Sequence, residues 1–432
     1  MREQPDTRAI DVVGGRRAQR TPQHRLVTVL GPAFVAAVAY VDPGNFAANF
    51  AAGAEHGTLL LWVLISVNLA ACVVQFLAAK LGYVTARSIS ELVGERLGPI
   101  GRWLFWLQAT LVVIATDIAE VIGGAVGLYL LVGLPLPIGG VVTGVASLAL
   151  LLVHTRWGQE AFERMILVLL LLIPMGFLAG LVLHPPMPDE LLAGLVPRFA
   201  GVDTVLLAVA MLGATVMPHV IYLHSTMARD RREAGRAREV DAEAEAQRVR
   251  RFLSLTRVDV GLAMAVAGSI NCSMLILAAS AMRGSPGAAS LEGIFRSLSD
   301  GIAPWVAVLF ALGLTISGFA STAVGGQAGA SVMDGLLPRD LPLVWRRVIV
   351  IAPAVVLLML IPEPTGLLVL SQALLAFGIP FALIPLVVFT NSSRVMGEYR
   401  NGPILRAIAW AIAVVVVLVD LALVVMSALG VA

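Results

Sequence analysis

The sequence predicts an all-α polytopic membrane protein with eleven transmembrane helices. Of its 432 residues, 58% are hydrophobic and 13% are charged, and the mean hydropathy is +0.89. Apolar runs of roughly 20 residues, the length that spans about 30 Å of hydrocarbon, recur along the chain. Two of these runs are interrupted by a proline, within residues 40–46 and 214–220. A soluble protein could not cover so many apolar runs, and a β-barrel would show shorter, alternating segments.

The predicted spans follow one another through short polar connections. They are residues 28–52, 58–82, 103–131, 136–154, 163–184, 201–227, 254–282, 301–333, 346–361, 364–390 and 404–429. Successive connections between spans lie on opposite sides of the membrane. The side that includes the N-terminal tail carries 26 arginines, and the other side carries 3. Basic residues that flank spans stay in the cytoplasm, so we expect a cytoplasmic N-terminus and an external C-terminus. The basic tail 1–27 has no apolar core like that of a cleavable signal peptide.

The two broken spans are the first and the sixth, so each opens a set of five. An odd number of spans per repeat inserts the second copy upside down, as in many secondary transporters. We therefore expect one repeat over 28–184, an inverted repeat over 201–390 and an additional helix over 404–429. The charged segment 228–253 is expected to form a cytoplasmic helical connector, and the segments 184–188 and 285–300 are expected to be external loops.

The two breaks carry side chains that can bind a metal ion. A proline has no amide hydrogen, so at membrane depth it leaves a backbone carbonyl that an ion can satisfy. Asp42 and Asn45 offer oxygen atoms, which suit Mg²⁺, Ca²⁺, Na⁺ or Mn²⁺ about equally. Met217 offers a thioether, which favours Mn²⁺, Fe²⁺, Co²⁺ or Cd²⁺. The alternative for Met217 is a core-filling role.

Two histidines follow the second break. His219 can be a metal ligand or a proton carrier because imidazole titrates near physiological pH, and the alternative is a hydrogen-bonded core residue. His224 projects about 140° away from His219 on an unbroken helix, so we do not expect the two to share one ligand shell. A relay role or a structural hydrogen bond is the expectation for His224.

The third span contains Asp117 and Glu120, which lie one helical turn apart on one face. Two carboxylates this close favour a shared proton, which suits a proton route better than a permanent ion cage. The structural alternative is pairing with Arg346 and Arg347 at the head of the ninth span. A buried ion-pair network can also relay protons, so the two hypotheses are compatible.

Neutral polar side chains also occur inside spans. Most are expected to form helix–helix hydrogen bonds, namely Asn271, Ser317, Ser321 and Gln327. Gln372 is a further candidate ligand because it lies in a flexible stretch of the tenth span, before Gly378 and Pro380.

Three motifs together resemble the Nramp family of proton-coupled divalent metal transporters, and most of all its bacterial manganese transporters. They are Asp42-Pro43-Gly44-Asn45, Met217-Pro218-His219 and Thr116-Asp117-Ile118-Ala119-Glu120. The resemblance covers roughly residues 28–429 and implies a LeuT-type fold with two inverted five-helix repeats. It implies that the metal is bound by the side chains of Asp42, Asn45 and Met217, by the carbonyls of Ala39 and Ala214, and in some states by Gln372.

The resemblance also implies a proton route. It leads from Asp42 through His219 to Glu120 and Asp117 and then to Arg346 and Arg347, with His224 as a further candidate. One departure lies in the eighth span, where Phe319 and Ala330 occupy positions at which many relatives carry glutamine. The ligand residues are intact, so the departure concerns eighth-span contacts and gating.

The function expected from the sequence is proton-coupled import of Mn²⁺ or Fe²⁺ by alternating access, with Cd²⁺ and Co²⁺ as further candidate ions. We expect a protein of the bacterial inner membrane with the lipid bilayer as its partner, without a permanently bound cofactor, nucleic acid or obligate protein partner. The alternatives are a Na⁺-coupled amino-acid symporter of the same architecture and a passive divalent-cation channel. A metalloenzyme is disfavoured because the sequence has no HExxH motif.

Overall fold

All regular secondary structure in the part of the chain that the structure describes is helical. The computed structural model describes residues 31–235, 242–284, 290–336, 343–361 and 364–428. The helices are α1 (Pro32–Ala39), α2 (Pro43–His56), α3 (Leu61–Thr85), α4 (Ile89–Arg96), α5 (Pro99–Val132), α6 (Leu136–Trp157), α7 (Gln159–Leu172), α8 (Met175–Leu183), α9 (Pro188–Gly194), α10 (Val202–Thr215), α11 (Pro218–Ala234), α12 (Ala242–Ala281), α13 (Leu291–Gly301), α14 (Pro304–Leu336), α15 (Leu343–Leu360), α16 (Thr365–Ala376), α17 (Ile379–Asn391), α18 (Ser393–Met396), the 3₁₀ turn η2 (Gly397–Tyr399) and α19 (Pro403–Ala428).

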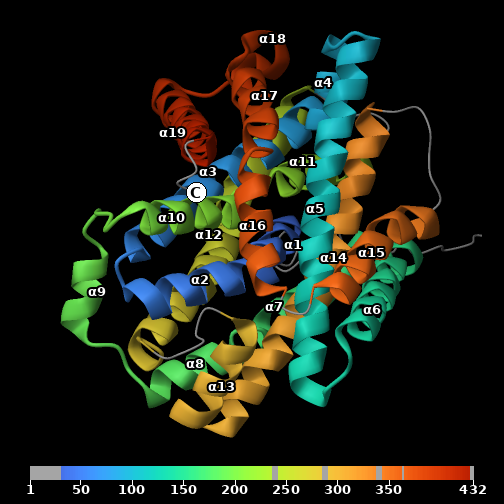
Figure 1. Ribbon diagram of the computed structural model, residues 1–432. Coiled ribbons are helices and arrows are strands. Elements are labelled where there is room, and N and C mark those ends of the chain that lie inside the picture. Colours follow the sequence, from blue (N-terminus) through green and yellow to red (C-terminus); the bar gives the residue numbers. More distant parts are fainter. Residues whose placement is uncertain (1–30, 236–241, 285–289, 337–342, 362–363, 429–432) are drawn as a thin grey trace, which may run out of the picture.

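The long helices α5 and α14 pack side by side through the middle of the molecule (Figure 1). The short helices α4 and α18 lie at one end, the upper end of Figure 1, and α8 and α13 lie at the lower end. Helix α1 is central, packed against α12, α7, α14 and α11, and α2 packs against α12, α10 and α16. The two helices of the first predicted span are therefore enclosed by helices from distant parts of the sequence.

Eight helical segments among the described residues are long and apolar enough to cross a membrane, or up to nine if the bent pair from Ile379 to Tyr399 forms one span. The predicted number of eleven is not confirmed. The first predicted span is divided into α1 and α2, of 8 and 14 residues, and the tenth into α16 and α17. The ninth corresponds to α15, whose apolar part is Ile351–Leu360. Breaks at Pro and Gly divide some predicted spans into short helices, and short helices are not counted as spans.

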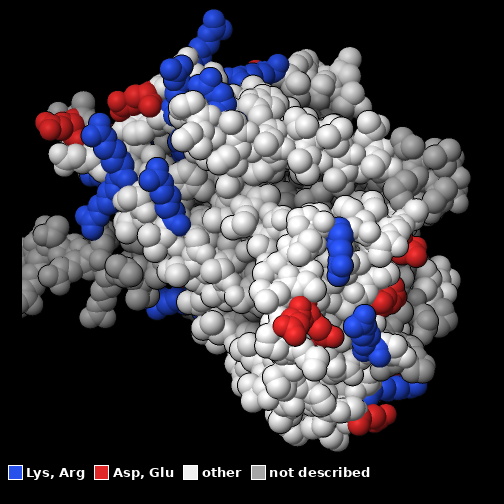
Figure 2. Space-filling model, turned by 90° about the vertical axis from the view of Figure 1, so that its left-hand side faces the viewer, with Lys and Arg blue, Asp and Glu red and all other residues white. Residues whose placement is uncertain are grey.

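The outer surface is apolar over much of its area. Many large hydrophobic side chains on the long helices are exposed, for example Leu69, Leu104, Leu111, Val145 and Leu418. Figure 2 shows many Lys and Arg side chains with a few Asp or Glu side chains toward the upper left of one face, a mixed group of charges at its lower right, and a broad region of few charges between them. A polytopic membrane protein has this pattern, because lipid replaces water around its apolar belt.

An aromatic cluster anchors the first broken span. Phe46 and Phe50 of α2 pack against Phe177 of α8 and Phe310 of α14, with ring centroids 5.2 Å apart for Phe46 and Phe177 and 5.3 Å apart for Phe50 and Phe310. All four side chains are fully buried. Edge-to-face contacts of this kind add to the stability that burial provides, so the start of α2 is held in a fixed position.

The connections differ in part from the expectation. The segment 285–300 was expected to be a loop, but Leu291–Gly301 forms helix α13, which buries Leu291, Ile294 and Leu298. The predicted connector 228–253 is helical where it is described, because α11 continues to Ala234 and α12 begins at Ala242. The N-terminal tail 1–27 lies outside the described residues.

Candidate metal centre at the two helix breaks

The first break comprises residues 40–42, between α1 and α2. Pro43 stands four positions after Ala39 and has no N–H, so the Ala39 carbonyl has no intrahelical donor. Asp42 ends the break as the N-cap of α2, and its Oδ1 accepts hydrogen bonds from the backbone N–H of Asn45 at 2.8 Å and from Asn45 Nδ2 at 2.7 Å. The carboxylate is therefore held at the break by its own helix, with 0% of the residue exposed.

Side chains from two other helices satisfy the remaining carbonyls of the first break. Asn271 of α12 donates to the Tyr40 carbonyl at 2.8 Å, and Ser317 of α14 donates to the Val41 carbonyl at 2.5 Å. Asn49 of α2 donates to Asn271 Oδ1 at 3.1 Å. No side chain among the described residues donates a hydrogen bond to the Ala39 carbonyl. This oxygen is therefore the carbonyl of the first break that a cation can bind.

The second break comprises Val216 and Met217, between α10 and α11. Pro218 stands four positions after Ala214 and deprives the Ala214 carbonyl of its intrahelical donor, as Pro43 does for Ala39. Asn45 Nδ2 donates to this carbonyl at 2.9 Å. This hydrogen bond joins the two breaks directly. Met217 is the N-cap residue of α11, makes no side-chain capping bond and is 0% exposed.

Gln372 of α16 completes the group of predicted ligands. Its Nε2 donates to Asp42 Oδ2 at 3.3 Å. Two glycines allow this approach. A Cβ at Gly44 would lie 1.8 Å from Gln372 Nε2, and a Cβ at Gly213 would lie 2.1 Å from the Gln372 backbone oxygen. Hydrogen bonds thus link Asp42 and Asn45 of the first break to Ala214 at the second break and to Gln372 of α16. That these residues bind a metal ion stays a prediction.

Two amide oxygens in this group have no donor. Asn45 Oδ1 and Gln372 Oε1 are buried without a hydrogen-bond partner in the part of the chain that the structure describes. Unpaired buried acceptors are costly, and a cation would satisfy them. Over the same residues, no group of three or more His, Cys, Asp or Glu side chains could hold a metal ion. The donor set suited to a cation is therefore one carboxylate, two amide oxygens, freed carbonyls and a thioether.

The predicted proton carriers lie beside this group on α11 and α5. His219 Nδ1 is 3.5 Å from Thr116 Oγ1, next to Asp117 in the sequence. Asp117 and Glu120 are almost fully buried and point toward α14, since a Cβ at Gly325 would lie 2.3 Å from Asp117 Oδ1 and 3.0 Å from Glu120 Oε2.

The predicted pairing of these carboxylates with Arg346 and Arg347 is not tested by the structure. Both arginines belong to α15, which packs against α5 and α6, but their side chains lie outside the described part of the chain. The pairing stays a prediction.

His224 belongs to a separate hydrogen-bonded group. Its Nδ1 is 2.8 Å from Gln75 Oε1, and Gln75 Nε2 donates to the Tyr40 hydroxyl. His219 and His224 thus have different hydrogen-bond partners. Sequence reasoning missed Gln75 and Tyr40, although a glutamine within the second predicted span is a signal for such a hydrogen bond.

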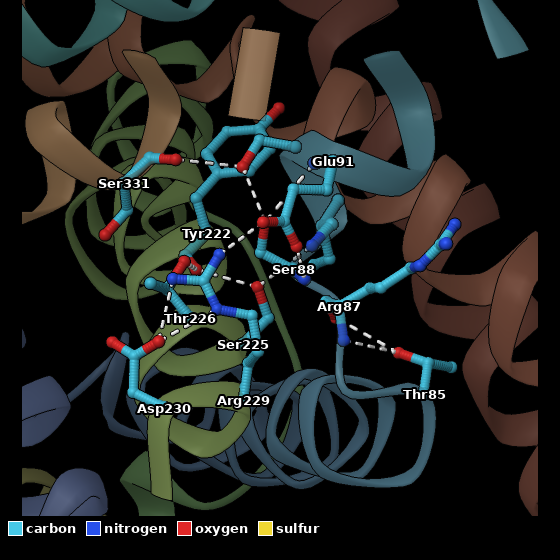
Figure 3. Close-up of polar contacts among 12 residues, drawn as sticks. Thr85, Arg87, Ser88, Glu91, Tyr222, Ser225, Thr226, Arg229, Asp230 and Ser331 are labelled. Carbon is cyan, nitrogen blue, oxygen red and sulfur yellow. Dashed lines mark hydrogen bonds and ion pairs between the residues drawn. The ribbon is translucent and has the colours of Figure 1, made fainter. Parts of the chain in front are cut away.

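A second polar cluster lies at the end of the molecule that carries α4. Arg229 of α11 forms an ion pair with Glu91 of α4, Ser225 Oγ accepts from the Ile89 backbone N–H at 3.2 Å, and Ser90 Oγ donates to the Ser331 carbonyl at 2.9 Å. Figure 3 shows these contacts between the ribbons of α4, α11 and α14. The contacts of Arg229 and Ser225 fix α11, the helix that follows the second break, against α4.

The two positions in the eighth predicted span at which many relatives carry glutamine lie outside the fully buried face of α14. Phe319 and Ala330 are partly exposed, whereas Gly318 and Gly325 are buried against α5. The close packing of α14 on α5 therefore depends on the small residues and not on the two substituted positions.

Comparison with known proteins places the chain in a family. The family described as "Nramp: Natural resistance-associated macrophage protein-like" matches residues 33–426. This match spans both breaks and nearly all of the described helices. The chain belongs to the Nramp family.

Nramp relatives resemble the chain over nearly its whole length. A divalent metal cation transporter MntH of Mycobacterium tuberculosis strain H37Rv is 50% identical over 402 residues, which cover 93% of this chain and 92% of that protein. An MntH of Deinococcus radiodurans is 42% identical over 395 residues, covering 91% and 88%.

Solved structures confirm the LeuT-type fold. The manganese transporter of Eremococcus coleocola superposes with a TM-score of 0.82 at 28% identity, covering 92% of this chain and 86% of that chain. MhsT in complex with L-phenylalanine superposes with a TM-score of 0.61 at 15% identity, covering 90% and 98%. The second likeness concerns the fold alone.

Proposed function

We propose that this Nramp protein imports divalent transition-metal ions, with Mn²⁺ and Fe²⁺ as the main substrates, together with protons. The observation that carries the proposal is the buried group at the two breaks, in which Asn45 and Gln372 each donate a hydrogen bond to the Asp42 carboxylate and Met217 ends the second break. One carboxylate with neutral oxygen and sulfur donors suits a bare transition-metal ion. The manganese transporter of similar structure supports the same substrate class.

Metal binding at this site requires a rearrangement of hydrogen bonds. Asn45 Nδ2 now donates to the Ala214 carbonyl and to Asp42 Oδ1, the same atoms that would face the ion. A cation placed there would replace both of these hydrogen bonds, and the Asn45 amide would turn its oxygen toward the metal. Because Asn45 holds the two breaks together, metal binding and the relative position of α2 and α10 are linked.

The proton is coupled through Asp42 in this proposal. A metal ion and a proton compete for one carboxylate, so binding of the metal releases the proton of Asp42. His219 lies within hydrogen-bonding distance of Thr116, the residue before Asp117. From there it would pass the proton to Glu120 and Asp117. The concentration of arginines on one side of the predicted spans supports a cytoplasmic N-terminus, an external C-terminus and an inner-membrane location.

The rival functions make different demands on the site. An amino-acid symporter can have this fold, since MhsT binds L-phenylalanine, but a zwitterion needs room beside the broken helices. Here the candidate ligands contact one another, and glycines at 44 and 213 bring Gln372 against both broken helices. A passive channel differs from a proton-coupled transporter because it cannot accumulate its ion against a concentration gradient.

One experiment tests the proposal against both rivals. Purified protein in proteoliposomes is given a panel of divalent ions under an imposed pH difference, with metal uptake and internal pH recorded together. We expect Mn²⁺, Fe²⁺ and Cd²⁺ to accumulate against their gradients with acidification of the interior. Uptake that only equilibrates the ion indicates a channel, and metal uptake abolished by an added amino acid indicates the symporter.

A further inference from the structure

A basic hollow lies away from the metal centre, between α3, α12 and the start of α19. It has a volume of about 440 Å³ and is lined by Phe76 and Lys80 of α3, Leu253 and Arg257 of α12, and Arg400 and Ile404 near the start of α19, among others. A smaller hollow beside it shares Leu253, Arg257 and Tyr399. Neither the metal site nor the proton carriers contribute to its lining.

The lining of the basic hollow carries three cations and no carboxylate. Lys80 is only 6% exposed, and its Nζ donates to the neutral Asn401 Oδ1 at 2.8 Å. The Arg257 guanidinium lies 5.5 Å from the centre of the Phe76 ring. Among the described residues, no ion pair within 4.0 Å involves Lys80, Arg257 or Arg400. Three cations around one hollow repel each other, and an anion would offset that repulsion.

The amino-terminal end of α19 also faces the basic hollow. Ile404 and Leu405, in the first turn of this 26-residue helix, line it. The first N–H groups of a helix have no intrahelical acceptor and carry a partial positive charge. The helix end therefore adds donors for an anionic oxygen to the donors of the three side chains.

Apolar side chains extend from the basic hollow along the same helices. Next to Arg257, Val258 is 52% exposed and Leu262, one turn further, is 47% exposed, while on α19 Ile404 is 76% and Ile408 43% exposed. α3, which carries Lys80, contacts both α12 and α19. Figure 2 views the side of the molecule on which α19 lies, and blue side chains gather in its upper left part, next to the region of few charges. The hollow thus joins a cationic rim to an apolar outer surface.

We propose that the basic hollow binds the phosphate headgroup of an anionic phospholipid, whose acyl chains lie along the exposed apolar side chains of α12 and α19. A free phosphate would use the cations but leave the apolar side chains uncovered, whereas a phospholipid of the surrounding leaflet covers both. Basic pockets between transmembrane helices at the cytoplasmic side favour anionic headgroups for these reasons.

The test measures lipid binding by native mass spectrometry of the full chain in detergent, titrated with phosphatidylglycerol or with phosphatidylcholine. We expect one phosphatidylglycerol to bind in preference to phosphatidylcholine. In the double variant Arg257→Gln/Arg400→Gln its affinity should fall about thirtyfold, the factor expected for two cations removed at a membrane surface. The double variant Arg257→Lys/Arg400→Lys, which keeps both charges, should bind within a few-fold of the unmodified protein.

The matched control is Arg156→Gln/Arg164→Gln. It removes two exposed arginines, Arg156 near the end of α6 and Arg164 in α7, both outside the basic hollow. Equal loss of binding in both Gln variants would overturn the proposal, because the effect would then be one of net charge. Displacement of the lipid by millimolar inorganic phosphate alone would also overturn it, in favour of a soluble-anion site. Should the Gln variant not fold, equal binding of the two lipids to the unmodified protein is the contradicting result.

Discussion

The two helix breaks bring different chemistry to one place. The first break, between α1 and α2, provides a charged ligand together with its own support: Asp42 caps α2, and Asn271 and Ser317 hold the neighbouring carbonyls. The second break, between α10 and α11, provides the neutral Met217, which makes no capping bond. Asn45 joins the two breaks through its hydrogen bond to the Ala214 carbonyl. In the proposed function, the first break would supply binding strength and the second would supply selectivity.

Removal of the charge at the first break should have the largest effect. Asp42→Ala deletes the one charged side chain among the four candidate ligand side chains, so we expect uptake of labelled Mn²⁺ into proteoliposomes to be abolished. It also deletes a helix cap, which costs about 1 kcal/mol of stability.

Asp42→Asn separates these two effects. Asparagine is an equally good N-cap, so this variant should keep the stability of the unmodified protein and still fail to transport. Asp203→Ala, which removes an exposed carboxylate from α10, is the control and should transport normally. Normal Mn²⁺ uptake by Asp42→Asn would contradict the role of the carboxylate.

The helix that precedes the second break depends on close backbone packing. A Cβ at Gly213 would lie 2.1 Å from the Gln372 backbone oxygen, and neither group can turn aside. We expect Gly213→Ala to separate α10 from α16 and to lower the free energy of unfolding by about 1–3 kcal/mol, measured by thermal unfolding in detergent. Gly261→Ala on α12, where a Cβ meets open space, should leave the unfolding temperature nearly unchanged. Similar unfolding temperatures for the two variants would show that α10 is free to shift.

Removal of the thioether should change selectivity more than rate. We expect Met217→Ala to retain Mn²⁺ uptake and to admit Ca²⁺ or Mg²⁺ more readily, because the soft donor that disfavours hard ions is gone. Uptake of each ion alone and in competition measures this. Met282→Ala removes an equally buried methionine directly after α12 and controls for cavity formation. Unaltered selectivity in Met217→Ala would refute the soft-ligand argument.

The smallest effect is expected at Gly44, after the first break. A Cβ there would meet the Gln372 side chain, which can turn away, so Gly44→Ala should cost only the hydrogen bond from Gln372 to Asp42. Mn²⁺ affinity should fall a few-fold, in keeping with about 0.5–1.5 kcal/mol for one such bond. Gln372→Ala should give the same loss, and the double variant no more than either single one. Additive losses would show that Gly44 acts through another contact.

The sequence predicted the parts of the site that depend on local chemistry. Pro43 and Pro218 interrupt long apolar runs, and Asp42, Asn45 and Met217 are polar or polarisable residues beside those interruptions, so their grouping followed from hydropathy, motif and family resemblance. In the structure, hydrogen bonds join Asn45 to Asp42 and to the Ala214 carbonyl, and metal binding by these residues stays a prediction.

The sequence did not predict the contacts that depend on distant partners. Asn271 reaches the Tyr40 carbonyl across 231 positions, and Ser317 reaches the Val41 carbonyl across 276. Asn271 and Ser317 were both expected to form helix–helix hydrogen bonds, but no local sequence pattern predicts which group accepts each bond. Helix α13 was missed because the Gly- and Ser-rich start of its segment outweighed the helical spacing of Leu291, Ile294 and Leu298.

The most direct test of the account locates the metal itself. Crystals grown with Mn²⁺ and measured near the manganese absorption edge would give an anomalous difference map of the whole protein. The account predicts one strong peak between the two breaks, within bonding distance of an Asp42 carboxylate oxygen and the Met217 sulfur. A peak bound to only one break, or a strong peak elsewhere with none at the breaks, would contradict the claim that the two breaks form one metal site.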